Sequence, residues 1–235
     1  DYNDVPNDTF TNVSAAKALR IASAAAKIVG DTPDPRWADI AASMYVPFFE
    51  KDGHHLDFDP SVPHDIDSWG GSALPMLAYP SLDLPMDATL RRRDFDYALA
   101  PITQSHRDPN SMGLAPTSIA AATLGDGAGA SAWFQRNITA NVLKPPFNVR
   151  TETAGNNTGY FLTAAAGLLQ NVVYGFSGLR IEQDGLVEVY APMLPPQWKS
   201  LTLRRIAFRG KLYDIAITRD ANGKVGLTRT LRTTP

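Results

Sequence analysis

Residues 147–182 read FNVRTETAGNNTGYFLTAAAGLLQNVVYGFSGLRIE, which is a polar loop followed by an apolar helix and then a strand. The loop holds one carboxylate, Glu152. Helical periodicity runs from about Asn157 to Gly175, and alternation of apolar with polar residues begins at Leu179. Rigid elements position loops that meet substrates, so a loop carboxylate here is a candidate for chemistry. An isolated loop acid is also commonly a solvated side chain, and this segment alone leaves both interpretations of Glu152 open.

After this segment the period of the sequence is that of strands. Apolar and polar residues alternate, and short turn sequences rich in Gly, Asp and Asn separate the alternating runs. The runs are 179–182, 186–190, 201–208 and 212–218, and the turns are 183–185, 209–211 and 220–223. Residues 176–235 are therefore predicted to form an antiparallel sheet that needs a partner layer to bury one face.

Before this segment the chain favours helices. Helical spacing or capping residues predict helices over 12–29, after Asp34-Pro35, over 68–77, after Asp87, over 114–124, over 128–143 and after Asn157. In the helix over 128–143, we expect Trp133, Phe134 and Ile138 to form the inner face. Helices with no strand between them pack on one another. The predicted class is therefore α+β and multi-domain, helical over 1–175 and β over 176–235.

A long polar loop over residues 50–66 interrupts the helices. Loops of this length in compact domains usually bind something, so we expect it to face a substrate. It is rich in potential metal ligands: His54, His55, Asp57, Asp59, His64 and Asp65. Their spacing matches no recognised ligand pattern and two prolines interrupt it, so no metal site is predicted.

Composition excludes several classes of function. The formal charge of −2 without a basic stripe disfavours a nucleic-acid partner, and no apolar run is long enough to predict a membrane span. The chain has no cysteine, which excludes disulfides and thiolate metal sites. Sequons at Asn7, Asn12, Asn137 and Asn156 favour a glycosylated protein that is secreted, extracellular or vacuolar.

Several segments, in order, resemble glycoside hydrolase family 65, which contains trehalases, glucosidases and disaccharide phosphorylases. Residues 7–12 resemble the family's Asn-Asn-x-x-Tyr-Thr-Asn segment, and residues 77–80 its Leu-Leu-x-Tyr-Pro segment. Residues 147–152 with 161–179 give the closest match, and residues 194–198 are similar to the start of the family's last sheet. The resemblance implies the second half of an (α/α)6 barrel over 1–175, followed by a small antiparallel β-sandwich over 176–235. It also implies a partner, the N-terminal portion of the same enzyme.

The resemblance further implies an inverting cleavage of an α-glucosidic bond in a disaccharide or oligosaccharide. A carboxylic acid protonates the leaving oxygen, and a base activates water across a gap of ~6.5–9.5 Å. Glu152 matches the family's base, in an Arg-Thr-Glu loop. The family's acid lies just before the Asn-rich segment, so it either precedes the first residue of this chain, which we favour, or is Asp1 itself.

The chain departs from the family where a Lys-Gln pair holds the sugar, because it has Trp69-Gly70-Gly71 there. Trp69 offers a stacking face, and His64, Asp67 and His106 are the other residues expected to line the pocket. Glucose specificity is therefore in question, and no cofactor is implied. A phosphorylase of the same fold and a non-catalytic carbohydrate-binding relative are the alternatives.

Overall fold

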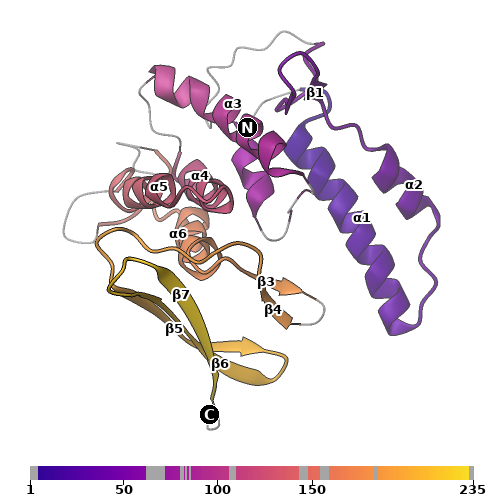
Figure 1. Ribbon diagram of the computed structural model, residues 1–235. Coiled ribbons are helices and arrows are strands. Elements are labelled where there is room, and N and C mark those ends of the chain that lie inside the picture. The colour runs from indigo at the N-terminus through magenta and orange to yellow at the C-terminus, as the bar shows by residue number, and fades with distance from the viewer. Residues whose placement is uncertain are drawn as a thin grey trace. The chain divides into compact units, whose positions relative to one another are not determined.

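A computed structural model describes residues 5–61, 72–79, 82, 84, 86–105, 110–142, 148–153, 159–182 and 185–232 (Figure 1). The chain divides into two compact units, Asp1–Pro109 and Asn110–Pro235, here called the N-terminal and C-terminal units. Among the described residues, no helix is both long and apolar enough to cross a membrane.

The N-terminal unit is mostly helical. Its elements are α1 (Thr9–Val29), α2 (Arg36–Ser43), β1 (Phe48–Phe49), β2 (His54–His55), the 3-10 helix η1 (Leu74–Ala78) and α3 (Ala88–Ser105). Asp8 caps α1 by accepting from the Thr11 N–H, and Gly30 ends the helix in the left-handed conformation that glycine adopts at low cost. Val13, Leu74, Leu77 and Ala98 form the buried core of this unit and join α1, η1 and α3.

The C-terminal unit begins with helices and ends with strands. Its elements are α4 (Ser111–Thr123), α5 (Gly127–Thr139), α6 (Leu162–Gln170), the π-helix η2 (Asn171–Gly175), β3 (Leu179–Glu182), β4 (Gly185–Glu188), β5 (Ser200–Phe208), β6 (Lys211–Arg219) and β7 (Val225–Leu231). Helix α4 is the centre of the helical part, because most of its residues are buried and it packs against α5, α6 and η2 (Figure 1). The change from helix to strand at Leu179 agrees with the change in sequence period.

The strands form an antiparallel pair, β3–β4, and a separate antiparallel sheet of order β5-β6-β7. The register of β5 shifts between Leu203 and Ile206, and Arg205 has φ +58°. The Asp214 carboxylate accepts a 2.9 Å hydrogen bond from the Arg205 N–H at this bulge. The extra residue keeps Leu203 and Ile206 in contact with the same apolar cluster although two arginines separate them.

The inner face of α5 differs from the prediction at two positions, one of which is Trp133, which is only half-buried. Phe134 is buried as expected, but Ile138 is 39% exposed and its neighbour Asn137 is fully buried. Phe134 packs edge-on against Phe176 and Trp198, with ring centroids 4.9 and 5.7 Å away. Compared with the predicted orientation, the helix is rotated so that the polar side chain of Asn137 enters the interior.

Candidate functional site

The loop that carries Glu152 is held by the ends of helices in the C-terminal unit. The Thr151 N–H donates to the Asn141 carbonyl at 2.8 Å, just after α5. The Phe161 N–H, at the start of α6, donates to the Arg150 carbonyl at 2.9 Å. Arg150 also forms an isolated antiparallel bridge with Val142. The residues flanking Glu152 are thus fixed between the exit of α5 and the entry of α6.

Helix α4 fixes the loop from a third direction. Ser111, its first residue, donates its backbone N–H to the Glu152 carbonyl at 2.8 Å and its hydroxyl to the Thr151 carbonyl at 2.5 Å. Thr151 is fully buried, and its hydroxyl lies 3.0 Å from the Asn141 carbonyl and 2.9 Å from the Thr153 carbonyl. Glu152 itself is half-buried. The backbone at Glu152 is thus fixed by hydrogen bonds, while its side chain is partly exposed.

Arg150 anchors the same loop to α5 through its side chain. Its guanidinium is buried and donates to the Asn137 side-chain oxygen at 3.0 Å and to the Asn137 backbone carbonyl. Burial lowers the pKa of Arg150 below its ordinary value. A buried cation needs hydrogen-bond partners, which explains why Asn137 and not an apolar residue occupies the interior of α5. Sequence periodicity could not reveal this pair, because its two members lie in different elements.

The burial of Asn137 argues against the glycosylation predicted there. The residue lies in a sequon, but its side chain is fully buried and its oxygen is engaged by Arg150. A glycan on its amide nitrogen would require the interior of the unit to open. Of the other predicted glycosylation sites, Asn7 is exposed, and Asn12 is half-buried with its amide donating to the Tyr45 carbonyl at 2.7 Å. Asn156 lies outside the described residues.

Asp1, His64, Asp67, Trp69 and His106 also lie outside the described residues. Their assignment to the site stays a prediction.

If Glu152 is the base that the family resemblance implies, Arg150→Lys should lower kcat about tenfold with little change in KM. A lysine cannot donate to two acceptors with the planar guanidinium geometry, so the loop is held less firmly, and a small displacement of a catalytic group is costly. Steady-state kinetics at a temperature where the variant is folded by circular dichroism would measure this effect. Arg204→Lys, at an exposed position of β5, is the matched control and should leave kcat unchanged. An unchanged kcat for Arg150→Lys would show that the pair only supports the fold.

In the N-terminal unit, an Asp–His pair anchors the loop rich in potential metal ligands. The Asp94 carboxylate, on α3, accepts from the His55 N–H and lies 2.8 Å from the His55 Nδ1. The ring of His54 stacks on Tyr97, with centroids 4.3 Å apart. Asp94 and Tyr97 are three residues apart on one face of α3, and no local sequence pattern indicates their contacts with His55 and His54. Within the described part of the chain, no three possible metal ligands come together.

Asp57 in the same loop is a buried carboxylate. One of its oxygens accepts 2.8 Å hydrogen bonds from the Ser72 hydroxyl and from the Ala73 N–H, at the start of η1. Burial outweighs these hydrogen bonds and raises the pKa of Asp57 to about 6. The Asp57 side chain therefore caps the start of η1, and the folded state favours its protonated form.

The raised pKa predicts how stability depends on pH. Between pH ~4 and ~6 the folded state binds more protons at Asp57 than the unfolded state, so the free energy of unfolding falls as pH rises through this window. Across this window the free energy of unfolding should fall by about 3 kcal/mol. This is about 1.4 kcal/mol for each pH unit between the ordinary pKa of an aspartate and the raised pKa of Asp57. Asp57→Asn keeps the acceptor oxygen without the charge, so it should remove this dependence and raise stability at pH 7.

Urea denaturation of both proteins at pH 4, 5, 6 and 7 would test this. Asp39→Asn, at an exposed position of α2, should keep the slope of the unsubstituted protein. If the free energy of unfolding of Asp57→Asn fell with pH as steeply as that of the unsubstituted protein, a group other than Asp57 would be responsible.

The chain is similar to known proteins over most of its length. Residues 179–222 match the model described as glycosyl hydrolase family 65, C-terminal domain. The chain is 31% identical over 218 residues to a kojibiose hydrolase of Mucilaginibacter mallensis, covering 89% of this chain and 30% of that protein. It is 30% identical over 222 residues to a protein-glucosylgalactosylhydroxylysine glucosidase of Danio rerio, covering 92% and 32%.

Two further comparisons concern a more distant relative and a solved structure. A periplasmic/secreted acid trehalase of Candida glabrata is 23% identical over 244 residues, which cover 95% of this chain and 20% of the trehalase. The fold matches that of a human-microbiome protein assigned as a kojibiose phosphorylase, with a TM-score of 0.62 and 16% identity, over 96% of this chain and 34% of that one. The chain thus spans about a third or less of the length of these relatives, and the solved structure supports the fold alone.

Proposed function

Residues 179–222 match the C-terminal domain of glycosyl hydrolase family 65, and from this premise we propose that the chain is the C-terminal part of an inverting α-glycoside hydrolase. Relatives that align over nine-tenths of the chain are named as a hydrolase and a glucosidase. The observation that carries the proposal is the half-buried carboxylate of Glu152 on a loop anchored by α4, α5 and α6. Its role is the general base that removes a proton from the attacking water.

The architecture that goes with this function is the second half of an (α/α)6 barrel over residues 1–175, followed by a small β-sandwich over 176–235. The helices before Gly175 and the strands after Leu179 support this arrangement. In it, the Glu152 loop stands at the rim of the barrel, where loops on a rigid scaffold meet the substrate. The N-terminal portion of the enzyme completes the barrel.

The chemistry needs a second carboxylic acid on the opposite side of the scissile bond. We place it just before the first residue of this chain, with Asp1 as the other candidate. A separation of ~6.5–9.5 Å from Glu152 leaves room for the water. His64, Asp67, Trp69 and His106 are proposed to line the sugar site, with Trp69 stacking on a pyranose ring. No metal or cofactor enters this scheme.

The proposed substrate class is α-linked glucosides such as those in the relatives' names: kojibiose, trehalose and the glucosylgalactosyl unit of hydroxylysine. Secretion is proposed on the basis of the exposed sequon at Asn7 and the periplasmic/secreted trehalase relative.

Proton NMR of fresh digests by the full-length protein would test the proposal. Kojibiose, trehalose and a glucosylgalactosyl-hydroxylysine peptide are incubated with and without inorganic phosphate. We expect β-glucose to appear first from at least one of them, without any need for phosphate. The second glucose leaves trehalose as the α anomer and leaves kojibiose as an anomeric mixture, so only the glucose whose anomeric carbon is attacked is diagnostic. Release of that glucose as the α anomer would contradict inversion. An absolute need for phosphate would identify a phosphorylase, and binding without turnover would identify a carbohydrate-binding relative.

A further inference from the structure

The last three strands concentrate positive charge in an otherwise acidic protein. Residues 199–235 contain nine lysines and arginines against two aspartates, while the rest of the chain contains 13 basic and 22 acidic side chains. Such a segregated field attracts anions to this sheet over a range of about a Debye length. The proposed sugar cleavage makes no use of this charge.

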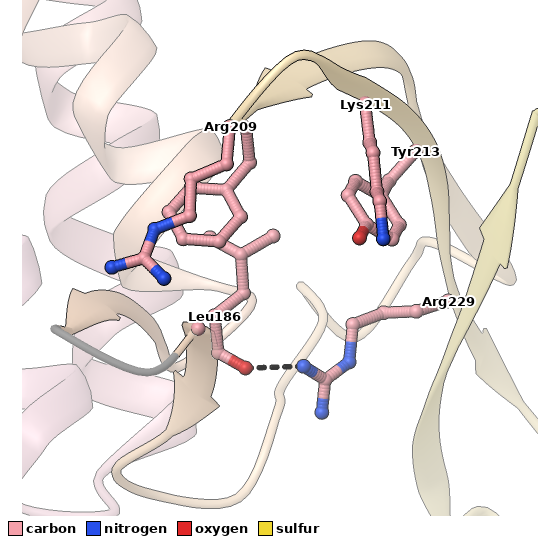
Figure 2. Close-up of a pocket in the computed structure, with 7 residues that line it drawn as sticks. Leu186, Arg209, Lys211, Tyr213 and Arg229 are labelled. Atoms are coloured by element: carbon pink, nitrogen blue, oxygen red, sulfur yellow. Dashed lines mark hydrogen bonds between the residues drawn. The ribbon is translucent and has the colours of Figure 1, made fainter.

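A pocket of about 380 Å³ lies where this sheet faces the β3–β4 pair (Figure 2). Three of its lining residues are cationic and none of the described lining residues is acidic: the cations are Arg209, Lys211 and Arg229. In Figure 2 the side chains of Lys211 and Tyr213 point the same way, toward the Arg229 guanidinium across the gap. Arg209 lies apart from them beside Leu186, with its guanidinium 5.4 Å from the Phe208 ring centroid.

Arg229 is held in place by the opposite strand. Its guanidinium donates to the Leu186 carbonyl of β4 (Figure 2). It also lies 3.4 Å from the Glu188 carboxylate. A guanidinium has five N–H donors, so these two contacts leave others for a ligand. Two cations that face one pocket repel each other, and an anion between them would turn this repulsion into attraction.

The size and lining of the pocket indicate more than a bare anion. Its volume is within the range of sites for small organic ligands and larger than a phosphate needs. Tyr213 is half-buried and offers a ring face together with a hydroxyl, and Leu186 adds apolar surface. An aromatic face next to hydrogen-bond donors suits the C–H face and hydroxyls of a pyranose.

We propose that this pocket is a second carbohydrate site, separate from the Glu152 loop, that binds an anionic sugar unit: a pyranose bearing a carboxylate, sulfate or phosphate. Lys211 and Arg229 bind the charged group, and Tyr213 contacts the ring. The site requires no bond to be made or broken, and its ligand need not be a substrate of the enzyme.

Titration calorimetry on the full-length protein would test the site with glucuronate, glucose 6-sulfate and glucose 6-phosphate, and with glucose and inorganic phosphate as comparisons. We expect at least one charged sugar to bind at least tenfold more tightly than either comparison, and to bind more weakly as salt is added. Equal affinity for glucose 6-phosphate and inorganic phosphate would overturn the sugar assignment. Absence of binding by every charged sugar would overturn the site.

Substitutions assign the binding to this pocket. Arg229→Gln should weaken it about tenfold and Lys211→Gln several-fold, while Glu188→Gln, which removes the acid beside Arg229, should strengthen it. The matched controls are Arg204→Gln on β5 and Lys224→Gln before β7, which are exposed and do not line the pocket. Lys211 is exposed, so its variant stays interpretable if Arg229→Gln unfolds. Equal losses in the control variants would show that only the general charge of the sheet attracts the ligand.

Discussion

Glu152→Gln is expected to lower kcat of the full-length enzyme by about 10²–10⁴-fold, the usual contribution of a general base, with little change in KM. In the proposed mechanism Glu152 accepts a proton from the attacking water, and glutamine has the shape of glutamate but cannot do so. The loop itself should stay in place, because the hydrogen bonds that fix it come from the backbone of Glu152 and from Arg150, Thr151 and Ser111. Steady-state kinetics with the best α-glucoside substrate would measure the loss.

A control and a chemical rescue separate catalysis from structure. Glu182→Gln, at an exposed position of β3, should keep full activity. In Glu152→Ala, added azide can attack without a base, so we expect a glycosyl azide of inverted configuration. An unchanged kcat in Glu152→Gln would remove Glu152 from the mechanism and leave only the fold assignment.

Phe176→Ala is expected to lower the free energy of unfolding by about 3–5 kcal/mol, the usual cost of deleting a buried phenyl ring. Phe176 is 1% exposed, and its ring meets Phe134 and Trp198 edge-on, with centroids 4.9 and 5.8 Å away. Its carbonyl also accepts from the Met193 N–H at 2.8 Å. The ring therefore joins α5, the end of η2 and the segment that leads into β5, and its removal leaves a cavity between them.

Chemical denaturation followed by tryptophan fluorescence would report this change, because Trp198 is one of the three rings. Leu169→Ala is the control from the same unit, since its side chain is 66% exposed and its loss should cost less than about 0.5 kcal/mol. A loss below about 1 kcal/mol for Phe176→Ala would mean that the neighbouring rings close the space.

Sequence patterns predicted the elements well where a single period persists. The strand at Leu179, the bulged strand β5 and the cap of α3 by Asp87, which accepts from the Leu90 N–H at 2.8 Å, all follow local rules. The long loop was less predictable. Its short hairpin β1–β2 depends on Asp94, which is 39 residues from His55 in the sequence. Local periodicity carries no signal for such a contact.

Predictions of which side chains are buried failed where a polar or charged side chain lies in the interior of the C-terminal unit. Ile138 was expected on the inner face of α5 because apolar side chains usually occupy such positions. Asn137 is buried there because Arg150, from another element, needs a partner. The change from helix to strand near residue 176 is visible in the spacing of apolar residues. The division into two compact units, between residues 109 and 110, is a different boundary and depends on contacts between distant residues.

By itself, the sequence determined most of the helices and the strands after Leu179, because side-chain period is a local property. It also singled out Glu152 as the carboxylate of a loop next to an apolar helix. Only the tertiary structure decided what holds that loop and which polar side chains are buried, because these depend on hydrogen bonds between distant residues. The same is true of the cationic pocket, whose lining residues come from β4, the end of β5 with the turn after it, β6 and β7.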